Sequence, residues 1–587
     1  MKSTKFLMLP IAALVSTLCA CGGGSDSSGL LPGTPVAPSS GGYTAGNLLV
    51  SRSVYDPGFT VTGPIREYDG NPTGAGTAAA PVDAVTPGTF PNVFTNEAND
   101  PNFGVTADIW LDQWTPNGAG AASSANLTEL AQKSGFDITT SFPSKSELAL
   151  NVSLDKSAIT FVGYNAPHNR IDISNSNTPD VIDPTNTDVA TPTYRTVAQL
   201  NLAGNTLSFT NTSAYSGNNG RAAVLASGRY YLVGNAGNSG KNPNPTYDQV
   251  NMLTLNTGVQ SIAAGSSCAL TQVIGAFHTG NGSTYTPATG GGCTPAQAQG
   301  TIIDPMGPLP FVKASDAGGN QFGFSIADVP GEVYDKTGKD DNFRGLFVGS
   351  DGTVYVSKGS GSNGVNTVYQ VGATGALAGG GKLVQDVPIS IVPGFPTANA
   401  ANLLTSSSKP GAAQPPASTL AAGVVYPFGM WIPANNAALM FVGDEGDSGT
   451  AAYAPNGSGG LWVYRNADGA WTPIAHVTQG LNLGQNYTVT DAAGAYGATG
   501  ASYTTTADGL RNITGQANSD GSYTIYAVTS TIGNSLGSGF DAGADSNQLV
   551  KINLTVNDST VTTSGFSVMQ TAPFGQVLRG VAIVPQS

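Results

Sequence analysis

The stretch that most constrains the fold is residues 341–371, DNFRGLFVGSDGTVYVSKGSGSNGVNTVYQV. It holds three short runs rich in Val, Tyr, Phe and Leu, at residues 343–348, 353–357 and 367–371. Gly-Ser-Asp-Gly separates the first two runs, and a Gly/Ser run separates the last two. β-branched and aromatic residues interrupted by such turn residues are typical of strands joined by tight hairpins. The stretch therefore predicts a small antiparallel sheet.

Weaker copies of this unit recur along the chain. In several copies the first strand carries Arg, or Glu, just before a small or apolar residue, and the second strand ends in Val-Gly. Small antiparallel sheets repeated at irregular, long intervals predict an all-β propeller whose loops carry insertions. The copies predict about seven blades, within a range of six to eight. The copies lie at residues 144–166, 219–235, 341–371, 427–443 and 507–530.

The two ends of the chain complete one further unit. Residues 576–584 read as a first strand with no second strand after it, and residues 47–53 read as a second strand with no first strand before it. Pairing them would close the ring and protect the sheet edges at the termini. A stack of β-sandwich domains is the rival fold, but it needs linkers, and none is visible after residue 42. We predict a single propeller over residues 43–587, with a long loop insertion around residues 256–326.

Composition agrees with this fold and narrows the partners. Charged residues make up 10% of the chain and Gly occurs 78 times, whereas an ordinary soluble domain has roughly 25% charged residues. This mix suits turns and short strands better than long helices. The net charge is −14, with no Lys/Arg cluster. Nucleic acid is therefore not an expected partner, because phosphate binding requires concentrated positive charge.

Residues 1–20 predict an export signal. Lys2 and Lys5 precede a short apolar run at residues 6–15, which is too short to span a membrane. The run leads into Leu18-Cys19-Ala20-Cys21, followed by Gly-Gly-Gly-Ser. This segment resembles the lipobox of bacterial lipoproteins.

The lipobox resemblance implies that Cys21 is acylated, palmitate being one expected chain, with Cys19 as the fallback residue. A plain secretory signal is the alternative. Because no acidic residue follows Cys21 directly, the resemblance favours the outer membrane, with the folded part facing the periplasm or the cell surface. Residues 21–42, rich in Gly, Ser and Pro, predict a flexible tether.

From residue 43 onward the chain resembles secreted bacterial β-propeller proteins in the style of its repeats, and this resemblance brings no functional motif. Two cysteines, Cys268 and Cys293, remain outside the leader. In an oxidising compartment they predict a disulfide that closes a local loop. Two free thiols are the alternative.

One set of charged residues recurs at the same place in the repeat. In a propeller the first strand of each blade lines the central channel, so these side chains are expected near one end of it. They predict an anion-binding funnel for a carboxylate, a phosphate or a sugar acid. The structural alternative is that they join neighbouring blades through bonds to nearby Asp residues or loop carbonyls. The set is Arg221, Arg344, Arg511, Arg579 and Glu147.

Three loops rich in oxygen-bearing side chains are candidates for calcium, the only cofactor that the sequence suggests. Calcium takes roughly six to eight oxygen ligands, although such residues are also common in plain turns. None of the loops has the full EF-hand pattern. The candidate ligands are Asp172, Asn175, Asn177, Asp444, Glu445, Asp447, Asp541 and Asp545.

Other chemistries have little support. His168, His278 and His476 do not pair at metal-ligand spacing. Residues 533–537 form a Gly-x-Ser-x-Gly string, but a Gly-rich loop follows where a nucleophile elbow needs a helix. Aromatic residues inside the strands are expected to pack in the core rather than to bind carbohydrate. They are Tyr164, Tyr230, Tyr231, Trp431 and Trp462.

These observations favour a ligand- or protein-binding, or scaffold, module over an enzyme. Its expected partners are the lipid membrane, through Cys21, and an unidentified protein or small molecule. The alternative is a lactonase- or esterase-like propeller hydrolase that uses calcium or carboxylates at the channel mouth. A hydrolase predicts carboxylates converging at one end of the channel, whereas a binding module predicts arginine and amide groups there.

Overall fold

A computed structural model describes most of the chain from residue 42 onward. No helix in the described part is long and apolar enough to cross a membrane. The described residues are 42–58, 65–67, 82–84, 105–118, 120–171, 173–179, 181–182, 189, 191–235, 258–275, 277–278, 284–286, 301–303, 323–324, 342–359, 365–384, 387–397, 423–446, 458–496, 498–532 and 543–586.

The described residues form six antiparallel sheets of four or more strands, here called blades 1–6, and each is given from its innermost strand outward. Blade 1 is β33 (Gln576–Ile583), β1 (Leu48–Val54), β4 (Thr106–Trp114) and β5 (Ala121–Asn126). Blade 2 is β7 (Asn151–Val152), β8 (Ala158–Tyr164), β9 (Arg195–Asn201) and β10 (Thr206–Thr212). Blade 3 is β11 (Gly220–Ala226), β12 (Arg229–Gly234), β13 (Gly258–Ala263) and β14 (Gln272–Ile274).

The C-terminal half supplies the other three blades. Blade 4 is β19 (Gly345–Val348), β20 (Val354–Lys358), β21 (Thr367–Val371) and β22 (Ile389–Ile391). Blade 5 is β23 (Pro427–Trp431), β24 (Leu439–Asp444), β25 (Gly460–Ala467) and β26 (Ala470–Val477). Blade 6 is β28 (Ala501–Ala517), β29 (Tyr523–Ile532), β30 (Gln548–Asn557), β31 (Thr560–Thr563) and β32 (Ser567–Thr571), with β27 (Asn486–Asp491) paired to the start of β28.

Smaller elements lie beside the blades. One short helix, α1, follows β5, and its first turn is capped by the side chain of Asn126, which accepts the N–H of Glu129. The short elements outside the six blades are α1 (Leu127–Gln132), β6 (Thr140–Ser141), β2 (Ile65–Glu67) with β3 (Val82–Ala84), β15 (Phe277–His278) with β18 (Gly323–Phe324), β16 (Thr284–Thr286) with β17 (Thr301–Ile303), and the 3₁₀ turns Ile173–Asn175 and Ala378–Gly380.

The six blades close into a ring. Their innermost strands contact one another in the order β33, β7, β11, β19, β23, β28 and back to β33. A separate apolar cluster fills each of the six junctions between neighbouring blades. The fold is therefore the predicted all-β propeller, and its six blades lie within the predicted range.

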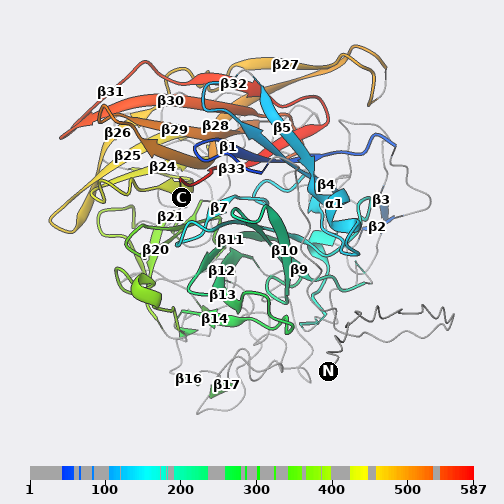
Figure 1. The fold of residues 1–587 in the computed structure, drawn as a ribbon, viewed down its shortest axis with the longest axis horizontal. Helices are drawn as coiled ribbons and strands as arrows, with labels where there is room; N and C mark the ends of the chain where they lie inside the picture. The colour runs from blue at the N-terminus through cyan, green and yellow to red at the C-terminus, as the bar shows by residue number, and fades with distance from the viewer. Residues whose placement is uncertain are drawn as a thin grey trace, which may run out of the picture.

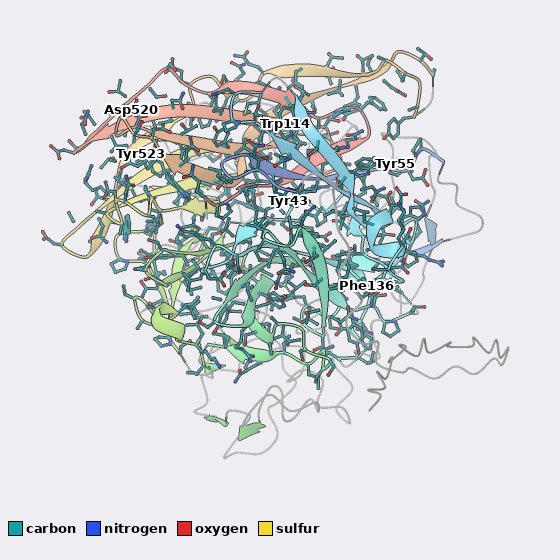
Figure 2. The ribbon with its side chains drawn as sticks, in the orientation of Figure 1. Tyr43, Tyr55, Trp114, Phe136, Asp520 and Tyr523 are labelled. Atoms are coloured by element: carbon teal, nitrogen blue, oxygen red, sulfur yellow. The ribbon has the colours of Figure 1, made fainter. Side chains whose placement is uncertain are left out.

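The predicted closure by the two ends of the chain is confirmed. β1 pairs antiparallel with β33, from Leu48 opposite Ile583 to Val54 opposite Gln576, and Figure 1 shows the blue strand beside the red one. Trp114 at the end of β4 then packs against Tyr526 and Leu549 of blade 6. Figure 2 labels Trp114, which lies at the sheet formed by the last part of the chain.

One predicted boundary is wrong. The insertion expected around residues 256–326 begins later, because β13 and β14 are the two outer strands of blade 3. These strands are only six and three residues long and lie in a stretch rich in Gly, Ser and Thr, so no long apolar run distinguishes them from the loops around them. Cys268 lies between them, whereas Cys293 lies outside the described residues. The disulfide remains a prediction.

Candidate anion-binding site at the centre of the ring

Three of the four arginines of the predicted set lie at irregularities of innermost strands, and the fourth, Arg344, directly precedes one. The pairing register shifts at Arg221 in blade 3, at Arg511 in blade 6 and at Arg579 in blade 1. In blade 4 the N–H groups of Arg344 and Gly345 both bond to Ser357, one to its carbonyl and the other to its hydroxyl. A β-bulge of this kind redirects a side chain from the regular alternation of the strand. The sequence therefore places an arginine at a bulge in blades 1, 3 and 6, and directly before the innermost strand in blade 4.

Close contacts between neighbouring innermost strands show that these positions correspond. Glycines near the bulges of three blades have no room for a side chain, because a Cβ would meet the backbone carbonyl of the next blade. In each case the carbonyl belongs to the residue that takes the place of the arginine in the repeat of that next blade; we call this place the arginine level. The pairs are Gly345 with Phe428, Gly429 with Arg511, and Gly580 with Leu148. Phe428 and Leu148 thus replace arginine at this level in blades 5 and 2.

A single carboxylate joins two of the arginines. Glu445 follows β24, and its carboxylate lies 3.4 Å from Nη1 of Arg344 and 3.3 Å from Nε of Arg511. The three side chains are between 5% and 10% exposed. Burial lowers the pKa of Arg511, and the Glu445 charge opposes this shift. Blades 4, 5 and 6 therefore share one buried ionic cluster.

The other two arginines also bond across blade junctions. Nη1 of Arg221 donates to the carbonyl of Phe343, 3.0 Å away, and to Oδ1 of Asn342. Arg579 donates from Nε to Oγ of Ser53 at 3.2 Å and from Nη2 to the carbonyl of Gly543 at 2.9 Å. These bonds are of the kind that the structural alternative predicts.

The same arrangement concentrates positive charge at the centre of the ring. Burial, and then the charge of Arg511, lowers the pKa of Arg579 to about 9. The charge of Arg344 likewise contributes to the lowered pKa of Arg511. The charge of Arg511 is thus opposed by that of Arg344 on one side and acts on Arg579 on the other, while Glu445 and Asp508 partly compensate it. Joining the blades and gathering an anion-attracting charge are compatible roles for this set.

Glu147, the fifth residue of the predicted set, is held differently. Its carboxylate accepts hydrogen bonds from Asn219 Nδ2 at 2.6 Å, Thr140 Oγ1 at 2.7 Å and the Ser141 N–H at 2.9 Å, and also from the Tyr164 hydroxyl. Burial and the Glu147 charge raise the pKa of Tyr164 well above its usual range. Glu147 is therefore engaged by four donors around blade 2, and it precedes the arginine level by one residue.

The loop after β24, predicted as a calcium site, has other partners. Oδ2 of Asp444 accepts the N–H groups of Val425 and Tyr426, and Oδ1 accepts those of Gly446 and Gly459. Burial raises the pKa of Asp444, although these hydrogen bonds oppose the shift. Asp444 thus fixes the backbone around Glu445.

The remaining calcium candidates do not form a cluster in the described part of the chain. Asn175 ends a 3₁₀ turn, and Oδ1 of Asn177 accepts from the Ser216 hydroxyl at 3.4 Å. Asp545 is buried beside two tyrosines. Within the described ranges, no three His, Cys, Asp or Glu side chains are arranged to hold a metal ion. The candidates Asp172, Asp447 and Asp541, like Cys21, lie outside the described residues.

Several predicted aromatic residues are confirmed as core. Tyr164, Tyr230, Tyr231 and Trp462 are at most 2% exposed. Trp431 packs against Phe441 and Tyr523. The Gly-x-Ser-x-Gly string lies outside the described residues.

Sequence reasoning missed two serines that support the site. Oγ of Ser357 donates to the Phe428 carbonyl at 2.6 Å and accepts the Gly345 N–H. In blade 1, Oγ of Ser51 makes the equivalent bonds to Leu148 and Gly580, both at 2.8 Å. Each hydroxyl thus connects an innermost strand to the next blade. A signal was present, because both serines stand in a Val-Ser-basic triplet, at residues 50–52 and 356–358.

Comparisons with known proteins add little to this geometry. No protein-family model and no curated protein matches the chain. Among solved structures, a calcium-free GH43 β-xylosidase/α-arabinofuranosidase from a compost microbial metagenome, CoXyl43 in complex with xylotriose, is 10% identical with a TM-score of 0.28, over 71% of this chain and 93% of that chain. A protein from Lactobacillus plantarum is also 10% identical with a TM-score of 0.28, over 91% of this chain and 99% of that chain.

Proposed function

We propose that the protein is an exported, lipid-anchored binding module whose propeller holds a small anionic ligand at the central arginine cluster. The cluster comprises Arg221, Arg344, Arg511 and Arg579, with Glu445. The observation that carries the proposal is that Glu445 of blade 5 lies between the buried Arg344 of blade 4 and the buried Arg511 of blade 6, with Arg579 of blade 1 within reach of the Arg511 charge.

The chemistry of the cluster favours an anion. A guanidinium group presents donors in a rigid fork that matches carboxylates and phosphates. A carboxylate of the protein itself, Glu445, lies 3.4 Å from Arg344 and 3.3 Å from Arg511, which supports a ligand of the same chemistry. Like charges buried near one another are costly unless anions compensate them.

The observed contacts favour binding over hydrolysis. General acid–base catalysis needs a carboxylate that can reach the substrate. Each oxygen of Asp444 already accepts two backbone N–H groups, and Glu445 is paired with two arginines. Asp444 and Glu445 are thus committed to holding the fold and the arginines.

The proposal predicts that oxoanions stabilise the protein. A ligand that binds only the folded state raises its stability, by about 2.7 kcal/mol at one hundred times Kd. For a chain of this size we expect the melting temperature of the full chain in detergent to rise by about 1–3 °C when sodium acetate or phosphate replaces sodium chloride at constant ionic strength. Arg511→Gln should lose this rise, whereas the matched control Arg465→Gln, outside the cluster, should keep it. Equal melting temperatures in all three salts would contradict the proposal.

Lipid anchoring gives a separate prediction. Expressed in a Gram-negative host, the wild-type chain should incorporate labelled palmitate and sediment with the membranes, because acyl chains bury their CH₂ groups in the bilayer. Cys21→Ser should lose the label and appear in the soluble fraction, whereas the neighbouring control Cys19→Ser should keep it. The reverse result would move the anchor to Cys19, and loss of label in neither variant would contradict lipidation at this segment.

A further inference from the structure

We infer that Arg579 and Arg511 together form one oxoanion subsite, separate from the position that Glu445 occupies between Arg344 and Arg511. The inference rests on the proposed function and makes it more specific. It assigns the ligand a compact oxoanion head group, either a carboxylate or a phosphate, located at the junction between blades 6 and 1.

One nitrogen of Arg579 makes no hydrogen bond within the described part of the chain. A guanidinium carries five N–H donors. In Arg579, Nε bonds to Ser53, and Nη2 bonds to the carbonyls of Phe142 and Gly543. Nη1 is buried and, within the described part of the chain, has no hydrogen-bond partner. Buried polar groups in folded proteins nearly always have a partner, so each exception requires an explanation.

The charge around Arg579 points to an anion as that partner. Arg579 is 4% exposed and forms no ion pair with any described residue. Two charges act on the pKa of Arg579: Arg511 lowers it and Glu147 raises it. The carboxylate of Glu147 is already engaged by four donors. Burial and the charge of Arg511 lower the pKa of Arg579 to about 9. A bound anion would offset both effects.

Arg511 is positioned to share that anion. Its strand, β28, contacts β33, the strand of Arg579, and its charge acts directly on Arg579. Arg511 Nε faces Glu445 at 3.3 Å, so the carboxylate of Glu445 approaches the Nε edge of the guanidinium. An oxoanion has two or more acceptor oxygens, so one can accept from Arg579 Nη1 while another faces Arg511. A water molecule would satisfy the hydrogen bond but would leave the charge repulsion in place.

Anomalous scattering can locate the subsite without altering the protein. Crystals of the full chain soaked in sodium selenate, which has the geometry of sulfate and phosphate, should show a selenium peak whose oxygens lie about 2.7–3.1 Å from Arg579 Nη1. A water molecule at Nη1 after soaking would overturn the inference. A selenium peak only beside Arg221 or Arg344 would also overturn it, while leaving the proposed function in place. No peak anywhere in the arginine cluster, together with no thermal shift, would contradict both.

Calorimetric titration of the full chain with acetate and with phosphate provides the second test. Arg579→Lys keeps a charge but removes Nη1, and it should weaken binding at least tenfold for the anion that binds the wild type more tightly. The matched control Arg465→Lys, which lies outside the cluster and bonds to the Asp558 carbonyl, should change Kd less than twofold. Equal losses in both variants would show that the loss is not specific to Arg579 and would overturn the subsite. Whichever anion binds the wild type more tightly identifies the head group. If Arg579→Lys fails to fold, the selenate experiment on the wild-type chain still tests the subsite.

Discussion

Glu445→Gln is expected to lower the free energy of unfolding by about 3–5 kcal/mol, because removing one partner of a buried ion pair leaves the other charge uncompensated. Here two guanidinium groups would lose their carboxylate, at 3.4 Å and 3.3 Å. The side chains are at most 10% exposed, so solvent would not screen the two positive charges effectively. Urea unfolding of the full chain, followed by tryptophan fluorescence, measures the loss.

The matched control is Glu129→Gln on α1. Glu129 also pairs with a cation, Lys133, at 2.9 Å, but both side chains are more than 60% exposed. Exposed pairs of this kind contribute about 0.3–0.5 kcal/mol. A Glu445→Gln variant that loses no more stability than the control would show that the cluster tolerates two unpaired guanidinium groups.

Chemical rescue distinguishes a purely structural Glu445 from one that occupies an anion site. Glu445→Ala removes the carboxylate and leaves space where it stood. Sodium acetate should then restore part of the lost stability, whereas chloride at the same ionic strength should restore less, because a carboxylate fits the guanidinium fork better. Equal effects of the two salts would favour a role for Glu445 in the fold alone.

The architecture was predictable from the sequence because the repeat and the two unmatched ends are local patterns. Residues 367–371 were predicted as a strand and form β21. The pairing of β1 with β33 follows from one strand that lacks a successor and one that lacks a predecessor. β13 and β14 were missed because they are only six and three residues long; their few Val and Ile residues do not mark a strand within a Gly-, Ser- and Thr-rich stretch, and tertiary packing selects their pairing.

The arginines of the site were also predictable, because each precedes a small or polar residue at the same point of the repeat. Their partners were not. Glu445 lies 101 residues from Arg344 in sequence and 66 from Arg511, so only the closed ring brings it between them. Glu147 was wrongly grouped with the arginines because it resembles them in sequence. In the structure it precedes their position in the repeat by one residue and accepts hydrogen bonds from Thr140, Ser141 and Asn219.

The spacing between blades depends on small residues beside the arginines, and Gly345→Ala tests this dependence. A Cβ on Gly345 would overlap the carbonyl oxygen of Phe428 in blade 5 and would lie 2.6 Å from Oγ of Ser357. The obstacle is backbone, which cannot rotate away as a side chain could. Overpacking of this kind typically costs about 1–3 kcal/mol and occasionally more, and we expect about 3 kcal/mol here.

Gly120→Ala is the control for Gly345→Ala, because a Cβ at Gly120 would have no atom within 4 Å and its backbone does not adopt a positive φ. It should stay within about 0.5 kcal/mol of the wild type. Besides the loss in urea, Gly345→Ala should speed amide exchange in β19 and β23, whose junction it forces apart, more than in β8 and β9 on the opposite side of the ring. Unchanged exchange at that junction, together with wild-type stability, would mean that blades 4 and 5 can separate without cost. The close approach of Gly345 to Phe428 would then not set the spacing between these blades.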